Sequence, residues 1–182
     1  MNTDNYIFRS ARLGFREWRD ADIAPFATLN ADPVVMEFFP GTRSYDETAA
    51  LVARFREHFS SHGYCFFAVD RLDTGTFIGF IGLNNPSFKA WFTPCVEIGW
   101  RILQSEWGQG FATEGAIRCL QYAFEELNLK EVWSFTAVLN KRSERIMQKA
   151  GMKQEGVFAH PALADGHWLQ EHVLYKADAP RS

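Results

Sequence analysis

The stretch Ile102-Leu-Gln-Ser-Glu-Trp107-Gly108-Gln109-Gly110-Phe111-Ala112-Thr113-Glu114 decides the fold, because a strand-like pattern ends in it and a helical pattern begins. Glycine lets backbone N–H groups approach a ligand closely, and a helix N-terminus adds unpaired donors and a partial positive charge. Gly108 and Gly110 therefore suit a phosphate or pyrophosphate. Taken alone, two such glycines fit a plain tight turn better, and neither the Walker pattern nor the dinucleotide-binding pattern is present.

Hydrophobic patterns extend from this junction in both directions. Upstream, strand-like runs at 64–70, 76–83 and 95–102 predict an antiparallel meander, with a tight turn at 73–75. A first strand is expected at 12–18. Two helices follow it, one opening at Asp20 and one opening at the capping box of Ser44 and Glu47 and ending before Gly63.

Downstream, the pattern predicts a central helix over 110–127, a strand at 132–137, a helix at 141–150, and final strands at 153–158 and 167–175. The strand, helix, strand crossover around the central helix should be parallel and right-handed. We therefore expect an α/β chain whose mixed, mostly antiparallel sheet has about seven strands and about four flanking helices.

The composition fits one folded domain over 1–182. Of the 182 residues, 47% are hydrophobic and 23% are charged, which is ordinary for a globular protein, and no repeat or linker divides the chain. With 19 basic against 22 acidic residues the net charge is −3, which argues against a nucleic-acid binder. The polar first nine residues and the lack of a long apolar run favour a cytoplasmic protein without a membrane partner. Three cysteines in apolar segments predict buried thiols, not a disulfide or metal site.

The junction resembles a known family of enzymes. Trp107-Gly-Gln-Gly-Phe-Ala112 is similar to the acyl-CoA pyrophosphate loop of the GNAT acetyltransferases, usually Q/R-x-x-G-x-G/A, with Trp107 at the first position. Together with Glu97-Ile-Gly-Trp-Arg-Ile102 it resembles the branch of Rim-type ribosomal-protein N-terminal acetyltransferases. Asn140-Lys-Arg-Ser143 and Lys149-Ala-Gly-Met152 match that branch's Asn-x-x-Ser and Lys-x-Gly-Phe patterns. The resemblance covers about 10–175 and implies the GNAT fold.

The resemblance implies that acetyl-CoA is the co-substrate, that a primary amine attacks it directly in a ternary complex, and that no metal is needed. Residues 107–113 would hold the pyrophosphate, the strand would line pantetheine through its backbone, and the later helix would meet the sulfur end and the 3′-phosphate. The implied CoA-binding residues are Trp100, Arg101, Ile102, Trp107, Gly108, Gln109, Gly110, Phe111, Ala112, Thr113, Asn140, Arg142, Ser143 and Lys149.

Two residues are candidates for catalysis. Glu97 lies among apolar neighbours, so desolvation could raise its pKa to suit a general base, acting directly or through water; a surface or salt-bridged glutamate is the alternative. Many family members carry a tyrosine as the acid where this chain has Met147, and that role cannot pass to Met147. Ser143 matches the serine proposed as the substitute in the Rim-like branch. Asn140 and Ser143 also suit an ordinary helix start.

The acceptor is less specified. Phe38 and Trp91 lie in irregular stretches where they could form an acceptor wall or a satellite core, and His160 is expected at the substrate rim. The Rim-like resemblance implies a protein N-terminal amine. A polyamine, amino acid or antibiotic is the alternative acceptor, and a catalytically silent acyl-CoA-binding module is the alternative to an enzyme. A homodimer is compatible with the sequence.

Overall fold

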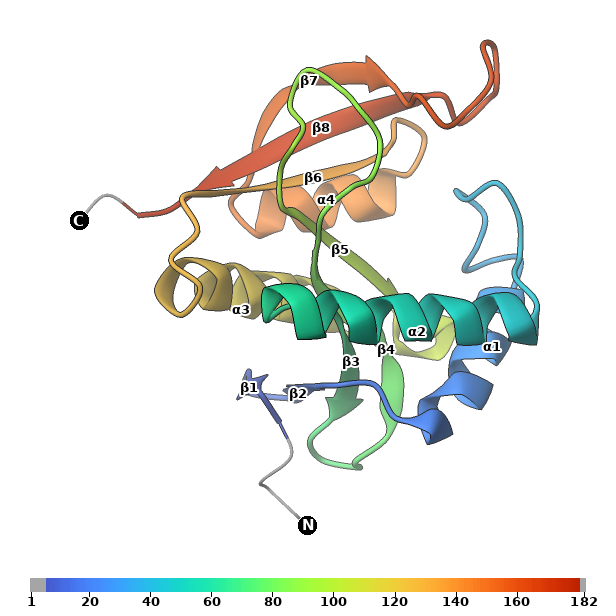
Figure 1. Ribbon diagram of the computed structural model, residues 1–182, viewed down its shortest axis with the longest axis vertical. Coiled ribbons are helices and arrows are strands. Elements are labelled where there is room, and N and C mark those ends of the chain that lie inside the picture. Colours follow the sequence, from blue (N-terminus) through green and yellow to red (C-terminus); the bar gives the residue numbers. More distant parts are fainter. Residues whose placement is uncertain (1–5, 181–182) are drawn as a thin grey trace.

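The computed structural model describes residues 6–180, and its frame is one eight-stranded sheet in the order β1-β2-β3-β4-β5-β6-β8-β7 (Figure 1). Neighbouring strands are antiparallel except β5 and β6, which are parallel. The strands are β1 (Phe8–Arg9), β2 (Leu13–Arg16), β3 (Phe66–Arg71), β4 (Phe77–Asn84), β5 (Glu97–Ile102), β6 (Glu131–Ala137), β7 (Lys153–Ala159) and β8 (Glu171–Asp178). The predicted mixed, mostly antiparallel sheet is confirmed.

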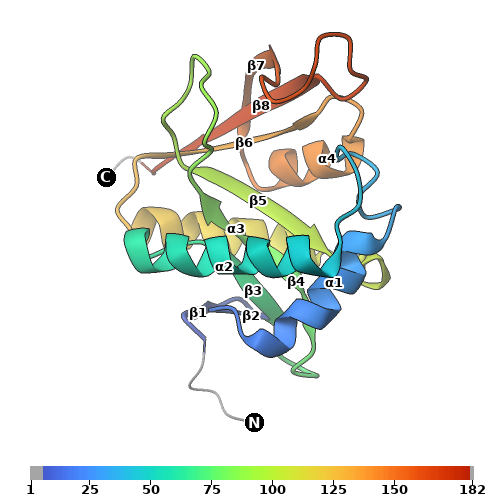
Figure 2. The same cartoon turned by 45° about the vertical axis from the view of Figure 1, so that its right-hand side comes forward.

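Four helices cover the sheet, α1 and α2 on one face and α3 and α4 on the other (Figures 1 and 2). They are α1 (Ile23–Ala31), α2 (Tyr45–His62), α3 (Phe111–Glu125) and α4 (Lys141–Lys149). Short 3-10 turns at Asp20–Asp22 and Gln104–Glu106 precede α1 and α3. Alternate side chains of a strand point to opposite faces of the sheet, so the side chain of each β5 residue lies on the side of one helix pair only.

Local sequence signals account for the helix ends. The side chain of Ser44 accepts from the Glu47 N–H and Glu47 returns a bond to the Ser44 N–H, which is the predicted capping box of α2. Gly63 ends α2 in the left-handed conformation at φ 78°. Gly110, the N-cap residue of α3, also has the left-handed conformation, at φ 82°. Each position favours glycine because a Cβ is strained at such φ values.

The structure adds one strand to the predicted set and moves the start of another. The sheet has eight strands, not about seven, because β1 is only two residues long and is too short to produce an alternating pattern. The last strand begins at Glu171, not at 167, because His167 N–H and Gln170 N–H close turns on Ala164 and His167. No helix within residues 6–180 is long and apolar enough to cross a membrane.

The interior contains two hydrophobic clusters. The larger one lies between the sheet and the helices and includes Ile81, Phe67 and Met147. The smaller one consists of Phe92, Trp133, Phe158 and Leu174, with four partly buried neighbours packed against it, namely Phe88, Ala90, Cys95 and Phe135. Because Trp133 pairs with Glu97 across parallel strands, this smaller cluster lies on the same face of the sheet as Glu97.

Candidate active site

The sheet opens between β5 and β6. Their ladder contains one register pair, Glu97 with Trp133, whereas β4 and β5 pair continuously from Gly79–Ile102 to Asn84–Glu97. The Trp133 N–H donates to the Val96 carbonyl over 2.9 Å, and beyond that point the two strands separate, as Figure 2 shows. The separation leaves a gap in the middle of an otherwise continuous sheet.

Main-chain groups of β5 face this gap. The Leu83 N–H donates to the carbonyl of Cys65, the residue that precedes β3, so the pair of Leu83 with Ile98 is not hydrogen-bonded across β4 and β5. In an antiparallel ladder the N–H directions alternate, so Ile98 and Trp100 direct theirs away from β4 and toward β6. Where β6 has diverged, the N–H of Trp100 is available to a carbonyl oxygen of a bound molecule.

Ser143 lies at the gap on the α4 side. Its Oγ accepts from Trp100 Nε1 over 3.3 Å and from Asn140 Nδ2 over 3.1 Å. Because these donors occupy both acceptor positions of the oxygen, the remaining hydrogen-bonding group of Ser143 is its own O–H. Asn140 is also the N-cap of α4, accepting from the Ser143 N–H, and it donates to Thr136 Oγ1 over 3.0 Å. The arrangement orients a hydroxyl donor.

Glu97 lies on the opposite face of the sheet from the side chains of Trp100 and Ser143. Burial raises the pKa of Glu97 from 4.5 to about 7, and the Asn84 amide, which donates to Glu97 Oε1 over 2.8 Å, opposes part of that rise. Within residues 6–180 the carboxylate forms no ion pair. A carboxyl group that titrates near neutrality can accept a proton from an amine.

The glycine turn leads into a groove along α3. Gly108 has φ 75°, and no atom lies within 4 Å of the position that its Cβ would occupy. The groove has a volume of about 700 Å³. Gly110, Thr113 and Lys149, three of the predicted CoA-binding residues, line it. The groove is lined also by Arg9 and Arg118, which sequence reasoning missed because no local motif connects them.

Arg142 lies elsewhere. Its guanidinium pairs with Glu37 over 2.7 Å and covers the ring of Trp107 at 4.3 Å. Arg142 is in the first turn of α4 and Lys149 in the last, so the two cations flank opposite ends of the helix and only Lys149 lines the groove. Met147 is 1% exposed within the core.

The remaining residues of the turn stabilise it. The Gln109 side chain donates to the Ser105 carbonyl, and the Gln109 carbonyl accepts from Arg12. Phe111 and Ala112 are buried, and the ring of Phe111 lies under the guanidinium of Arg12 at 4.4 Å. The carbonyl of Ile102 accepts from Trp107 Nε1 over 3.1 Å. These contacts fix the shape of the turn and leave Gly108 open, whereas the Cβ position of Gly110 lies 3.5 Å from the Arg12 guanidinium.

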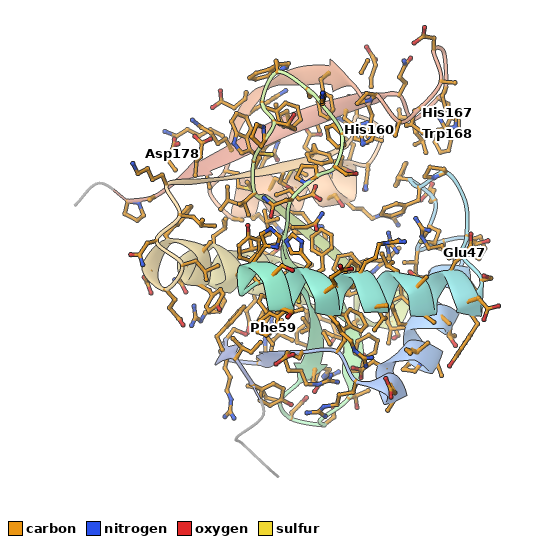
Figure 3. All side chains as sticks on the ribbon, in the orientation of Figure 1. Glu47, Phe59, His160, His167, Trp168 and Asp178 are labelled. Atoms are coloured by element: carbon orange, nitrogen blue, oxygen red, sulfur yellow. The ribbon has the colours of Figure 1, made fainter. Side chains whose placement is uncertain are left out.

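The three residues suggested for the acceptor do not form one wall. Phe38 faces Trp168, with ring centroids 6.4 Å apart, and His160 packs on Phe88 at 4.6 Å. Figure 3 shows His160 and Trp168 on the segment that joins β7 to β8. Trp91 packs on the smaller cluster through Trp133, 6.0 Å away, although 66% of it is exposed.

The family comparison agrees with this geometry. The model of the "Acetyltransferase (GNAT) domain" matches residues 12–153. The chain belongs to the GNAT acetyltransferase family. It is similar to the "Uncharacterized N-acetyltransferase YoaA" of Bacillus subtilis, at 28% identity over 177 residues that cover 96% of this chain and 98% of the relative. The GNAT chain is accordingly an acetyl-CoA-dependent N-acetyltransferase.

Solved structures show the same fold with different acceptors. The spermidine N-acetyltransferase of Vibrio cholerae, solved with CoA and spermine, has a TM-score of 0.71 at 23% identity, covering 91% of this chain and 95% of that one. The ribosomal-protein-S5-alanine acetyltransferase of Vibrio fischeri has a TM-score of 0.73 at 14% identity, covering 94% and 95%. The GNAT fold therefore leaves the acceptor of this chain open.

The described residues fit CoA. The opening between β5 and β6 provides a path through the sheet, the uncapped start of α3 offers N–H groups, and the groove beside them carries cationic side chains. No group of three or more metal-ligating side chains occurs within residues 6–180.

Proposed function

We propose that this GNAT enzyme transfers the acetyl group of acetyl-CoA to a primary amine, preferentially the N-terminal amine of a protein or peptide. The observation that supports this proposal most is the position of two side chains on opposite faces of the sheet. At the opening, the Glu97 side chain lies on one face of the sheet, and Ser143 of α4 contacts the Trp100 side chain on the other face, so the amine and the thiol end would be served from opposite faces.

On the α1 and α2 face, the Glu97 carboxylate accepts the proton of the incoming ammonium, directly or through a water that it orients. A pKa of about 7 leaves a substantial fraction of the group ionised at neutral pH, and an α-amino group with a pKa of roughly 7.7 to 8.0 releases its proton readily. The proton transfer produces the neutral amine that acyl transfer requires.

In the gap, the Trp100 N–H donates to the oxygen that gains negative charge during transfer. On the α4 face, the Ser143 O–H donates to the sulfur that leaves. Because Trp100 Nε1 and Asn140 Nδ2 both donate to the same Ser143 oxygen, they orient and polarise the hydroxyl for this task. At the far end, residues 107–113 hold the pyrophosphate with backbone N–H groups, and Lys149 is placed for a phosphate.

The preference for a protein N-terminus draws on the Rim-like motif and on the solved structure of the ribosomal-protein-S5-alanine acetyltransferase. The entrance on the Glu97 face is also bordered by two irregular segments, which carry Phe38 and Trp168. Phe38 is partly buried and Trp168 is 57% exposed, and accessible aromatic side chains on loops suit the backbone of a flexible peptide end.

The test is release of free CoA thiol from acetyl-CoA with two acceptor pools, one of peptides with free N-termini and one of small amines that includes polyamines and aminoglycosides. We expect turnover with the peptide pool, and none when the same peptides are N-terminally blocked. Turnover with the small amines alone would refute the peptide preference. Silence in both pools, with acetyl-CoA bound, would favour the non-catalytic module.

A further inference from the structure

Arg101 is a buried cation without an anionic partner. Its side chain is 9% exposed, yet no carboxylate within residues 6–180 pairs with it, and its Nε has no hydrogen-bond partner. Burial lowers the pKa of Arg101 to about 9, and the nearby positive charge of Arg43 acts in the same direction. Burying an unpaired charge is costly, so such a group calls for a functional explanation.

The surroundings of Arg101 hold it in place. Its NH1 group donates to Asn30 Oδ1 over 2.7 Å, and Asn30, which is fully buried, is itself fixed by a bond from its Nδ2 to Thr48 Oγ1 over 3.1 Å. The ring of Phe39 covers the guanidinium at 4.1 Å. These neutral contacts orient the guanidinium without neutralising it.

Arg43 adds a second cation at the same place. Its backbone N–H donates to the Asn30 carbonyl, which ties it to the residue that holds Arg101. The Nε of Arg43 is buried and also lacks a partner. The positive charge of Arg43 also acts on Glu47, but no ion pair joins either arginine to an acid within residues 6–180. Two neighbouring guanidinium groups can form a site for an oxyanion, since a carboxylate can accept from both.

The location of this pair selects the ligand. Arg101 lies on the same face of β5 as Glu97, four residues along the strand, or roughly 13 Å between Cα atoms. CoA phosphates belong to the other side of the sheet, at the start of α3. The anion must therefore belong to a group that reaches the Glu97 face.

We propose that Arg101 and Arg43 bind a carboxylate of the reacting molecule, so that the enzyme selects an amine acceptor that also carries a carboxylate. This inference rests on the proposed function and narrows its acceptor class. The two arginines repel a polyamine, which has only positive charges, and favour a peptide whose N-terminal amine lies close to a carboxylate. A carboxylated acyl chain is the second source of the same group.

The test compares matched acids and amides. Alanine, Ala-Ala and Ala-Ala-Ala are each supplied as the free acid and as the C-terminal amide, which varies the amine-to-carboxylate spacing in steps of about 3.5 Å. Turnover is measured with acetyl-CoA and with succinyl-CoA, and binding is measured by calorimetry in the presence of CoA. We expect at least one acid to be preferred over its amide by about 10- to 100-fold in kcat/KM and in affinity.

The variants identify the residues. Arg101→Gln and the more accessible Arg43→Gln should each bring the acid-to-amide ratio close to one. With Arg43→Gln, which lies outside the implied CoA-binding residues, the amide acceptors should keep their kcat. Arg101→Lys should keep part of the preference. Arg54→Gln, an exposed arginine on α2 without an ion pair in residues 6–180, is the matched control and should leave the ratio unchanged.

The outcomes separate this inference from the proposed function. Equal use and equal binding of acids and amides by the unmodified enzyme, with both acyl donors, would overturn the carboxylate site while N-acetyl transfer stands. Preferential binding of acids that Arg101→Gln abolishes, without turnover, would keep the site and refute the transfer. A preference for succinyl-CoA that Arg101→Gln removes would assign the carboxylate to the acyl chain.

Discussion

The Glu97 carboxylate is suited to act as a base because it is buried and has no cationic partner in the described part of the chain. Within residues 6–180 no cation pairs with its carboxylate, and the Asn84 amide is the one side chain that lowers its otherwise raised pKa. A carboxylate beside an arginine would have a pKa below its usual range and would be a poor base at neutral pH. The sequence identified Glu97 as a candidate; the absence of a partner could be seen only in three dimensions.

We predict that kcat/KM for a peptide rises with pH through an apparent pKa near 7, because the base of the free enzyme must be ionised to act. Asn84→Ala removes a donor that favours the ionised form, so it should move this limb to higher pH. A pH profile of kcat/KM for the two proteins checks both statements. An unmoved limb in Asn84→Ala would assign the titration to another group.

Ser143→Ala should lower kcat by about 10-fold, the value of one hydrogen bond to a charge that develops in the transition state, with little effect on KM. The fold should persist because Asn140 still caps α4 through the Ser143 backbone N–H. Ser60→Ala, at an exposed position of α2, is the control. Steady-state kinetics measure both parameters. Full activity of Ser143→Ala would show that solvent, and not Ser143, protonates the departing sulfur.

At the scale of elements, Gly108 in the turn between β5 and α3 can be compared with Gly75 in a turn outside the site, to distinguish a functional from a purely structural role of glycine. Gly108 and Gly75 both have positive φ values, 75° and 68°, and both face open space at their Cβ positions. Gly75 closes the turn between β3 and β4, on an edge of the molecule that has no part in the proposed site.

Gly108→Ala and Gly75→Ala should therefore lose similar stability, about 1 kcal/mol each, from placing alanine at a left-handed φ. Only Gly108→Ala should also weaken acetyl-CoA binding, by about 10-fold, because the turn would relax away from the pyrophosphate. Chemical unfolding and calorimetry measure the two effects. Equal acetyl-CoA affinities in the two variants would remove the turn from the ligand site.

The elements that the sequence predicted best are those defined by local chemistry. The capping box at Ser44 and the positive φ of Gly63 set the ends of α2, and both signals are short-range. The start of β8 was misplaced because turns at His167 and Gln170 end an apparently continuous run. The opening beside Glu97 depends on pairing with Trp133, in a strand more than thirty residues away, so no local pattern reports it.

At the scale of the whole molecule, the site divides between two faces that the chain assembles from distant segments. Gly110 and Lys149 were both predicted to bind CoA, and they line one groove. Arg142 was expected there too, and its pairing with Glu37 could not be foreseen because Glu37 lies in an irregular segment. Phe38, Trp91 and His160, the residues predicted for the acceptor, also lie in irregular segments, so their separation could not be predicted either.

The raised pKa of Glu97 also affects stability. A carboxyl group with a folded-state pKa of about 7 and an ordinary value of 4.5 binds its proton more tightly when folded, so its contribution to stability is lost as the pH rises between these values. Glu97→Gln lacks this titration. The free energy of unfolding of Glu97→Gln minus that of the unmodified protein should therefore be larger at pH 8 than at pH 5, by about 1 to 2 kcal/mol after allowance for solvent access. Urea unfolding at both pH values measures this difference, which a Glu97 with an ordinary pKa would not produce.

The most direct test of the two-face arrangement is to measure turnover and acetyl-CoA affinity of Glu97→Gln beside Glu57→Gln, an exposed glutamate on α2. The arrangement predicts that Glu97→Gln lowers kcat by about 100-fold or more while the Kd for acetyl-CoA stays within about twofold, and that Glu57→Gln changes neither. A Glu97→Gln protein with undiminished kcat, or one whose lost activity is matched by lost acetyl-CoA binding, would contradict it.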